Sequence, residues 1–313
     1  MIPIRFSSLL IPGIAACLLC LAAACGGNAS GNAANASTAD SAAAETFCPP
    51  VPDSLTTPDQ RADWAVVHYW DNFDFRSDPR ATDTAFVEQT MADYISLMPY
   101  ASATCRAQGV DALLDSAAVS APALDLIHFL ARKYLYEAAS PMHDEMFYLP
   151  FVEHALRRSS EPDPALEGLR DDILKNSPGT MAPAFTALAP DGSRFAVPDT
   201  STGGGTLLIF YEPDCEDCHR AIRFLAASEM LNRAVADGAI TVMAVFAGDD
   251  SAEWREHAAT MPAGWRVGRD TGVVDSDELY LIRATPTFYL IDPDGRVVLK
   301  DPTLQNLAMA LGL

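Results

Sequence analysis

Helical periodicity dominates the chain from about residue 56 to residue 176. Apolar side chains recur there at intervals of three and four residues, as along one face of an amphipathic helix. Thr57-Pro58 and Ser120-Ala-Pro122 are typical helix starts, because a hydroxyl residue caps the first turn and proline fits the first helical positions. Further helices are predicted over 83–99, 103–118, 144–158 and 163–175. We therefore expect an all-α helical domain over residues 47–176.

After about residue 178 the pattern changes to short apolar strands that alternate with helices. The runs 206–211 and 240–246 are continuous and apolar, as in the buried strands of a parallel sheet. The other predicted elements are strands on both sides of Asp191-Gly192, helices over 215–236 and 251–261, strands over 284–291 and 296–300, and a helix from Thr303. This alternation predicts an α/β sheet, covered on both faces, over residues 177–313.

Two residue patterns of the helical half invite a functional interpretation. The first is the aromatic cluster of Trp64, His68, Tyr69, Trp70, Phe73 and Phe75. We interpret it as core, since a small domain needs large apolar side chains inside. The second is His143-Asp-Glu145, which we interpret as a solvated loop, because no histidine of the chain has the spacing of metal ligands. We predict no metal site.

The N-terminus has the pattern of an export signal. Arg5 precedes an apolar stretch that ends in Leu21-Ala-Ala-Ala-Cys25. A cysteine at such a cleavage point resembles the lipobox of bacterial lipoproteins, although Ala22 departs from that pattern and Ile14-Ala-Ala-Cys17 fits its letters better. We expect residues 1–24 to be a lipoprotein signal peptide and Cys25 to be acylated. An uncleaved anchor helix is the alternative.

Residues 25–46 are predicted to form a flexible tether. They are mostly Gly, Asn, Ala, Ser and Thr, which cannot bury enough surface to offset the entropy lost on ordering. No later stretch is long and apolar enough to span a bilayer. We therefore expect an exported body, lipid-anchored to a bacterial membrane and facing the periplasm, where disulfides persist.

The charge balance limits the partners of the chain. There are 42 acidic residues against 21 lysines and arginines, for a net charge of −21. Such a surface repels phosphate backbones and anionic lipid headgroups. We predict no nucleic-acid partner, and attachment to the membrane only through the lipid anchor.

Four of the seven cysteines lie beyond the predicted tether, and their number is even. Cys215 and Cys218 are the candidate redox pair. Cys48 and Cys105 are either a structural disulfide or two unpaired thiols, because sequence alone does not give the separation of their Cα atoms.

Cys215 and Cys218 form a Cys-x-x-Cys motif where a buried strand ends and a helix is expected to begin. On the first helical turn this spacing brings both sulfurs within disulfide reach. The helix dipole and the free N–H groups there stabilise a thiolate on the first cysteine. With His219 the same letters are also the attachment signature of c-type haem. The motif therefore predicts either dithiol chemistry or haem attachment.

Four landmarks make residues 177–313 resemble the thioredoxin fold: Met181-Ala-Pro-Ala-Phe185, Phe210 ahead of Cys215-Glu-Asp-Cys218, Ala284-Thr285-Pro286-Thr287-Phe288 and Asp292-Pro-Asp-Gly295. The most similar branch is that of periplasmic, membrane-anchored thiol-disulfide oxidoreductases, related to cytochrome-maturation and alkyl-hydroperoxide-reductase-like thioredoxins. The helical half, with its motif over 67–75, resembles an uncharacterised domain found ahead of such thioredoxins in bacterial lipoproteins.

The resemblance implies a role for each site residue. Cys215 attacks and Cys218 resolves, and Cys215 is expected to be the more exposed. Pro286 is expected to be cis, with the backbone of Thr285 binding an extended substrate strand. The redox group is the disulfide itself, without a bound cofactor. The implied partners are exported protein thiols and disulfides and a membrane electron donor.

This chain departs from the family pattern around the dithiol. Ile209 and Ala221 stand where acids that move protons are usual, which leaves Glu212 and His219 as substitutes. We interpret His219 as a solvated helix residue, although a proton-transfer role stays open. Acidic neighbours on both sides of Cys215 raise the energy of its thiolate, so a reducing or mid-range couple is expected.

Two other functions compete with dithiol exchange. Haem attachment needs a small helical unit around the motif, whereas here a strand precedes it and a Thr-Pro strand follows. A non-enzymatic surface lipoprotein, in which the thioredoxin-like part is only a scaffold, is favoured by the missing acids. It is disfavoured by the joint presence of both cysteines and Thr285-Pro286.

Overall fold

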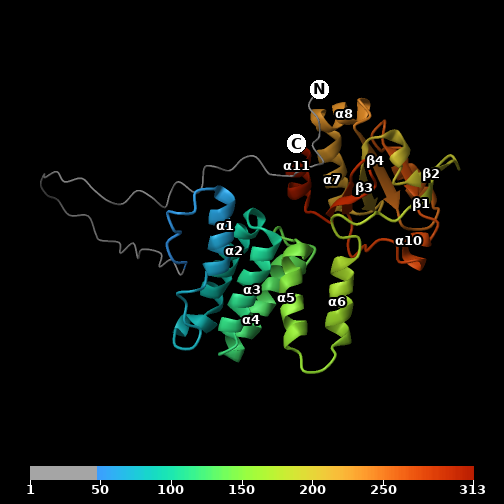
Figure 1. Ribbon diagram of the computed structural model, residues 1–313. Helices are drawn as coiled ribbons and strands as arrows, with labels where there is room; N and C mark the ends of the chain where they lie inside the picture. The colour runs from blue at the N-terminus through green and yellow to red at the C-terminus, as the bar shows by residue number, and fades with distance from the viewer. Residues whose placement is uncertain (1–47) are drawn as a thin grey trace, which may run out of the picture.

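The computed structural model describes residues 48–313 (Figure 1). The predicted signal peptide, the predicted acylation site Cys25 and the predicted tether lie outside the described residues. Among the residues that are described, no helix combines the length and apolar character that crossing a membrane requires.

The N-terminal half is helical, as predicted. Its α-helices are α1 (Pro58–His68), α2 (Thr84–Leu97), α3 (Ala103–Ala117), α4 (Ala121–Ala131), α5 (Glu145–Arg158) and α6 (Pro164–Leu174). Short turns η1 (Pro79–Thr82) and η2 (Met98–Tyr100) join them, and the π-helical turn η3 (Arg132–Tyr136) extends α4. Thr57 caps α1 in a capping box with Gln60, which confirms the predicted start.

The aromatic cluster supplies part of the core of this half. Trp70, Phe73 and Phe75 are 5%, 6% and 3% exposed, which confirms the interpretation as core. Trp64 and His68 are only half-buried, and their rings pack on each other at 4.6 Å between centroids. The cluster is therefore continuous from the interior to the surface.

The C-terminal half contains one seven-stranded sheet in the order β2-β1-β5-β4-β3-β6-β7. The strands are β1 (Phe185–Leu188), β2 (Arg194–Val197), β3 (Gly205–Tyr211), β4 (Ile240–Phe246), β5 (Arg266–Arg269), β6 (Thr287–Ile291) and β7 (Val297–Lys300). β3, β4 and β5 are parallel, and the flanking pairs are antiparallel.

Helices and a loop cover the two faces of this sheet. The helical elements are η4 (Thr200–Thr202), α7 (Glu216–Ala226), α8 (Glu229–Ala236), α9 (Ala252–Ala258), α10 (Val273–Ser276) and α11 (Leu304–Leu311). On one face, side chains of α7, α8, α9 and α11 form a buried cluster with alternate residues of β3. On the other face, α10 and Tyr280 form a second cluster with the intervening apolar residues of β3, Leu208 and Phe210. The α/β sheet with both faces covered is thus confirmed.

Two details differ from the sequence prediction. The helix expected over 215–236 is broken, because Ser228 caps a new helix by accepting a hydrogen bond from the Leu231 N–H. Strand β5 is short and reads Arg-Val-Gly-Arg, so it lacks the apolar run that would have revealed it. It forms through pairing with β4 rather than from its own propensity.

Helices α1 and α3 approach so closely that glycine is needed at residue 109. A Cβ atom added there would overlap the Val66 carbonyl oxygen and lie 2.7 Å from the Tyr94 hydroxyl. Gly168, on the exposed surface of α6, has no heavy atom within 4 Å of its added Cβ. Gly109 and Gly168 therefore allow the same substitution to be compared at a crowded and at an open position of a helix.

We expect Gly109→Ala to lower the free energy of unfolding by roughly 1–3 kcal/mol, because the two helices must separate. Gly168→Ala should raise it by up to about 1 kcal/mol through helix propensity alone. Urea denaturation of the full chain, followed by far-UV circular dichroism, measures both. Equal effects for the two variants would show that the approach of α1 to α3 is not tight.

Candidate active site

The dithiol lies where β3 ends and α7 begins. Cys215 is the N-cap of α7 and forms a disulfide with Cys218, with the two Cα atoms 5.2 Å apart. The Cys218 N–H donates a hydrogen bond to the Cys215 sulfur over 3.1 Å. Because this N–H belongs to the first turn of a helix, it would also stabilise a Cys215 thiolate in the reduced protein.

The two cysteines differ in exposure as predicted. Cys215 is half-buried, whereas Cys218 is fully buried in the same apolar cluster as Trp254 and Phe288. Only Cys215 is open to a large substrate, so it is suited to be the attacking sulfur. Cys218 is placed to resolve.

Thr285 and Pro286 lie against the dithiol. Their peptide bond is cis, as the resemblance implies, and the Thr285 carbonyl oxygen is 3.4 Å from the Cys215 sulfur. The next residue, Thr287, is buried and donates its hydroxyl hydrogen to the Ala284 carbonyl over 2.6 Å, which closes the loop before β6. The fold therefore brings together four predicted site residues from two distant segments.

The acidic residues near the dithiol all point to solvent: Glu212, Asp214, Glu216 and Asp217. Asp217 also pairs with Arg220 at 2.8 Å. Water and salt screen exposed charges. Their repulsion of a Cys215 thiolate is therefore weaker than their closeness in sequence suggests, and the N–H groups of α7 retain much of their effect.

The positions that hold acids in related thioredoxins are apolar and buried in this chain. Ile209 is 0% exposed and Ala221 is 2% exposed, both in the cluster that contains Cys218. Proton transfer for Cys218 therefore has to use another group.

His219 is not the simple solvated residue that the sequence suggested. Its Nε2 lies 2.7 Å from the Pro213 carbonyl oxygen, and its ring stacks on that of His257 at 4.8 Å. The hydrogen bond assigns the proton to Nε2 and leaves Nδ1 as the acceptor. His219 thus fixes the turn that leads into Cys215.

His257 continues this stack toward the core. Its ring lies 5.4 Å from that of Tyr211, whose hydroxyl accepts a hydrogen bond from Trp254 Nε1 over 3.2 Å. Partial burial, together with the charge of His219, lowers the pKa of His257. His257 therefore favours its neutral imidazole form.

Cys48 and Cys105 do not form the disulfide that was one of the two alternatives. Both are free thiols, half-buried. The Cys48 sulfur lies 4.0 Å from the Ala65 carbonyl oxygen of α1, while Cys105 sits in the first turn of α3. Burial and the charge of Asp71 raise the pKa of Cys48, which makes this thiol less reactive.

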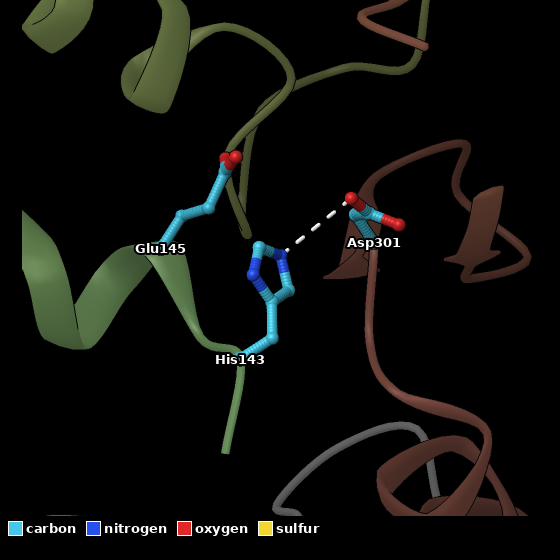
Figure 2. Close-up of side chains that lie close together, drawn as sticks. All are labelled: His143, Glu145 and Asp301. Carbon is cyan, nitrogen blue, oxygen red and sulfur yellow. Dashed lines mark ion pairs between the residues drawn. The ribbon is translucent and has the colours of Figure 1, made fainter. Parts of the chain in front are cut away.

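His143 and Glu145 correct another expectation, because the predicted solvated loop is buried. Their side chains are 3% and 4% exposed. Figure 2 shows the His143 ring, just before α5, turned toward Asp301 of the C-terminal half, with His143 Nε2 3.6 Å from an Asp301 oxygen. Burial lowers the pKa of His143, but the carboxylates of Asp301 and Glu145 outweigh this, so that the pKa is raised overall.

Glu145 is also paired with two cations of the C-terminal half. One carboxylate oxygen contacts Arg283 and the other lies 2.8 Å from Lys300 Nζ. Burial lowers the pKa of Lys300, although Glu145 opposes the shift. His143, Glu145 and Asp301 are close enough to share a metal ion, but these cations already balance the carboxylates. The cluster is an ion-pair network between the two halves, which no local sequence pattern could predict.

Comparisons with known proteins agree with this geometry. Residues 24–167 match the family model described as domain of unknown function DUF5106, a match that begins at the last residue of the predicted signal peptide and includes the predicted tether. No curated protein matches the chain. A thioredoxin-like protein from Bacteroides caccae is similar over 86% of this chain and 98% of its own, with 26% identity and a TM-score of 0.74.

Two further structures are each similar to less than half of this chain. A conserved protein of unknown function from Bacteroides fragilis shares 34% identity over 42% of this chain and 96% of its own, with a TM-score of 0.40. The thioredoxin domain of a thiol-disulfide oxidoreductase from Bacteroides vulgatus shares 24% identity over 42% of this chain and 95% of its own, with a TM-score of 0.36. The first likeness and the sheet show that this chain combines a thioredoxin-like fold in its C-terminal half with a helical N-terminal half.

The raised pKa of His143 predicts that its contribution to folding stability decreases as the pH rises. Protonated His143 stabilises the folded chain below about pH 6.5, and this contribution is lost as the pH rises through the folded-state pKa. We therefore expect the difference in unfolding free energy between the wild type and His143→Gln to shrink as the pH rises above neutrality. Urea denaturation at a series of pH values measures it.

His257→Gln is the control of opposite sign. Because the pKa of His257 is lowered, the folded chain gains stability relative to this variant as the pH rises toward about 6.5. A wild-type advantage over His143→Gln that increases with pH would contradict the ion pair with Asp301.

Proposed function

We propose that this chain is a thiol-disulfide oxidoreductase that exchanges dithiols and disulfides with exported proteins. The observation that carries the proposal is the position of the Thr285 carbonyl, 3.4 Å from the half-exposed Cys215 sulfur. A substrate strand that pairs with the backbone of Thr285 would hold its own disulfide against Cys215.

The reaction follows from this arrangement. The Cys215 thiolate attacks one sulfur of a substrate disulfide, the substrate S–S bond breaks, and the other substrate sulfur leaves as a thiolate that takes up a proton. Cys218 loses its proton and attacks Cys215 Sγ in the mixed disulfide, which releases the first substrate sulfur. The protein ends as the disulfide, and the substrate has gained two electrons and two protons. The reverse sequence oxidises a substrate dithiol.

The proton of Cys218 needs an acceptor, and His219 and Glu212 are the candidates. We favour His219, because its ring is restrained by the contact of Nε2 with the Pro213 carbonyl and by the stack with His257. Glu212 is exposed, so water or buffer could replace it.

Trapping of mixed disulfides tests the exchange. In Cys218→Ser the resolving sulfur is missing, so we expect covalent adducts of exported proteins on Cys215, identified by mass spectrometry. Cys215→Ser, which removes the attacking sulfur, is the matched control and should trap none. If Cys218→Ser accumulates no adducts either, the chain is a scaffold, the competing function.

We further propose a reducing or mid-range redox couple. The N–H groups of α7 stabilise the thiolate, but the exposed acids around it limit the gain. We expect a reduction potential closer to about −270 mV than to the about −120 mV of the strongest oxidants. Equilibration with glutathione buffers measures it, and a value at the oxidising end would disprove this part.

The reduced state requires a source of electrons, for which we propose a membrane electron donor. The sequence pattern at Cys25 supports an exported, lipid-anchored protein that faces the periplasm. We expect metabolic labelling with a fatty acid and recovery in the membrane fraction, both lost in Cys25→Ser. Labelling that persists in this variant would place the modification elsewhere.

A further inference from the structure

Arg283 lies two residues before Thr285, in the loop that carries the substrate-binding backbone to the dithiol. Its side chain turns away from the dithiol to the helical half. The guanidinium pairs with Glu145 of α5 and lies over the ring of Tyr136, 4.3 Å from the ring centroid. The loop is therefore held at one end by the helical half and meets Cys215 at the other.

The partners of Arg283 are themselves fixed. Glu145 is the first residue of α5, 4% exposed, and its second oxygen pairs with Lys300. Lys300 Nζ also donates to the carbonyl oxygens of Asp172 and Ile173, over 2.7 and 3.0 Å, where α6 ends. Glu145 is therefore held between α5, α6 and the end of β7.

The ring of Tyr136 is held from several sides as well. It packs on the ring of Tyr148 at 5.2 Å between centroids, and Arg132 lies over it at 5.4 Å. Tyr136 closes the π-helical turn after α4, and such turns are frequent at functional positions. Glu145 and Tyr136 thus form a fixed binding site for the Arg283 guanidinium.

A buried ion pair contributes little net stability but is costly to break. Its desolvation offsets much of its Coulomb attraction, whereas removal of one partner leaves an unpaired buried charge. The planar guanidinium also restricts the direction of approach, since it must meet a carboxylate and an aromatic face together. These contacts limit where the backbone two residues further on can lie.

We propose that the helical domain positions the Thr285-Pro286 loop against the dithiol, through the contact of Arg283 with Glu145 and Tyr136. This inference rests on the proposed dithiol exchange and assigns the helical half a part in it. Arg283, Glu145 and Tyr136 are positioning residues, because they act through the backbone of Thr285 and not on the sulfur.

The experiment separates substrate positioning from thiol reactivity in the full chain. For each variant we compare the rate of reduction of a protein disulfide, such as that of insulin, with the rate at which iodoacetamide alkylates the reduced Cys215. Only the first reaction needs the Thr285 backbone. For Glu145→Gln we expect roughly a tenfold lower rate of insulin reduction, typical of coupling between sites, with unchanged alkylation.

Three further variants distinguish the inference from a simple failure to fold. Tyr136→Leu removes the ring and keeps the ion pairs, so we expect a smaller fall in the same rate. Arg283→Lys keeps the charge, and it should retain more activity than Arg283→Met. Glu88→Gln is the matched control, because Glu88 pairs with Lys133 on the surface of the same half and its loss should change neither rate.

Three outcomes would overturn the inference. If Glu145→Gln and Tyr136→Leu reduce insulin as fast as Glu88→Gln does, the contacts of Arg283 with Glu145 and Tyr136 do not position the loop. An equal fall in insulin reduction and alkylation would show a structural role alone. If the wild-type protein is alkylated at Cys215 but reduces no protein disulfide, the proposed dithiol exchange itself is wrong, and with it the inference.

Discussion

The two halves of the chain are joined around one buried carboxylate, that of Glu145. A carboxylate removed from water is costly unless it is paired, and here Arg283 and Lys300 take one oxygen each. Both cations belong to the C-terminal half, so the carboxylate is satisfied only when the halves are in contact. The geometry of the interface, including the position of the loop that follows Arg283, depends on this pairing.

The redox site at the other end of that loop combines opposing electrostatic effects. The N–H of Cys218 and the dipole of α7 stabilise a thiolate on Cys215, while the neighbouring acids are exposed and screened. The cluster around Cys218 is apolar and includes Ile209 and Ala221, so neither of these neighbours can exchange a proton with it. The His219–His257 ring stack lies next to the turn that leads into Cys215, which His219 holds through its hydrogen bond to the Pro213 carbonyl.

Local signals explain why much of the fold was predictable. Helix starts depend on a few adjacent residues, and Thr57, Ser102 and Thr303 all cap helices where the pattern indicates. The long apolar strands β3 and β4 were equally clear. By contrast, β5 exists through its pairing with β4, and the break between α7 and α8 depends on one serine within a continuous helical pattern.

The sequence by itself determined the two-part organisation, the Cys215–Cys218 pair at a helix start and the Thr285-Pro286 loop, because each is encoded in neighbouring residues. Only the tertiary structure decided that Thr285 lies against Cys215, 70 residues away in the chain, and that Cys48 and Cys105 stay unpaired. It also decided that His143 and Glu145 are buried. Their charges are tolerated there because partners from the other half of the chain meet them, and such pairing leaves no trace in local sequence.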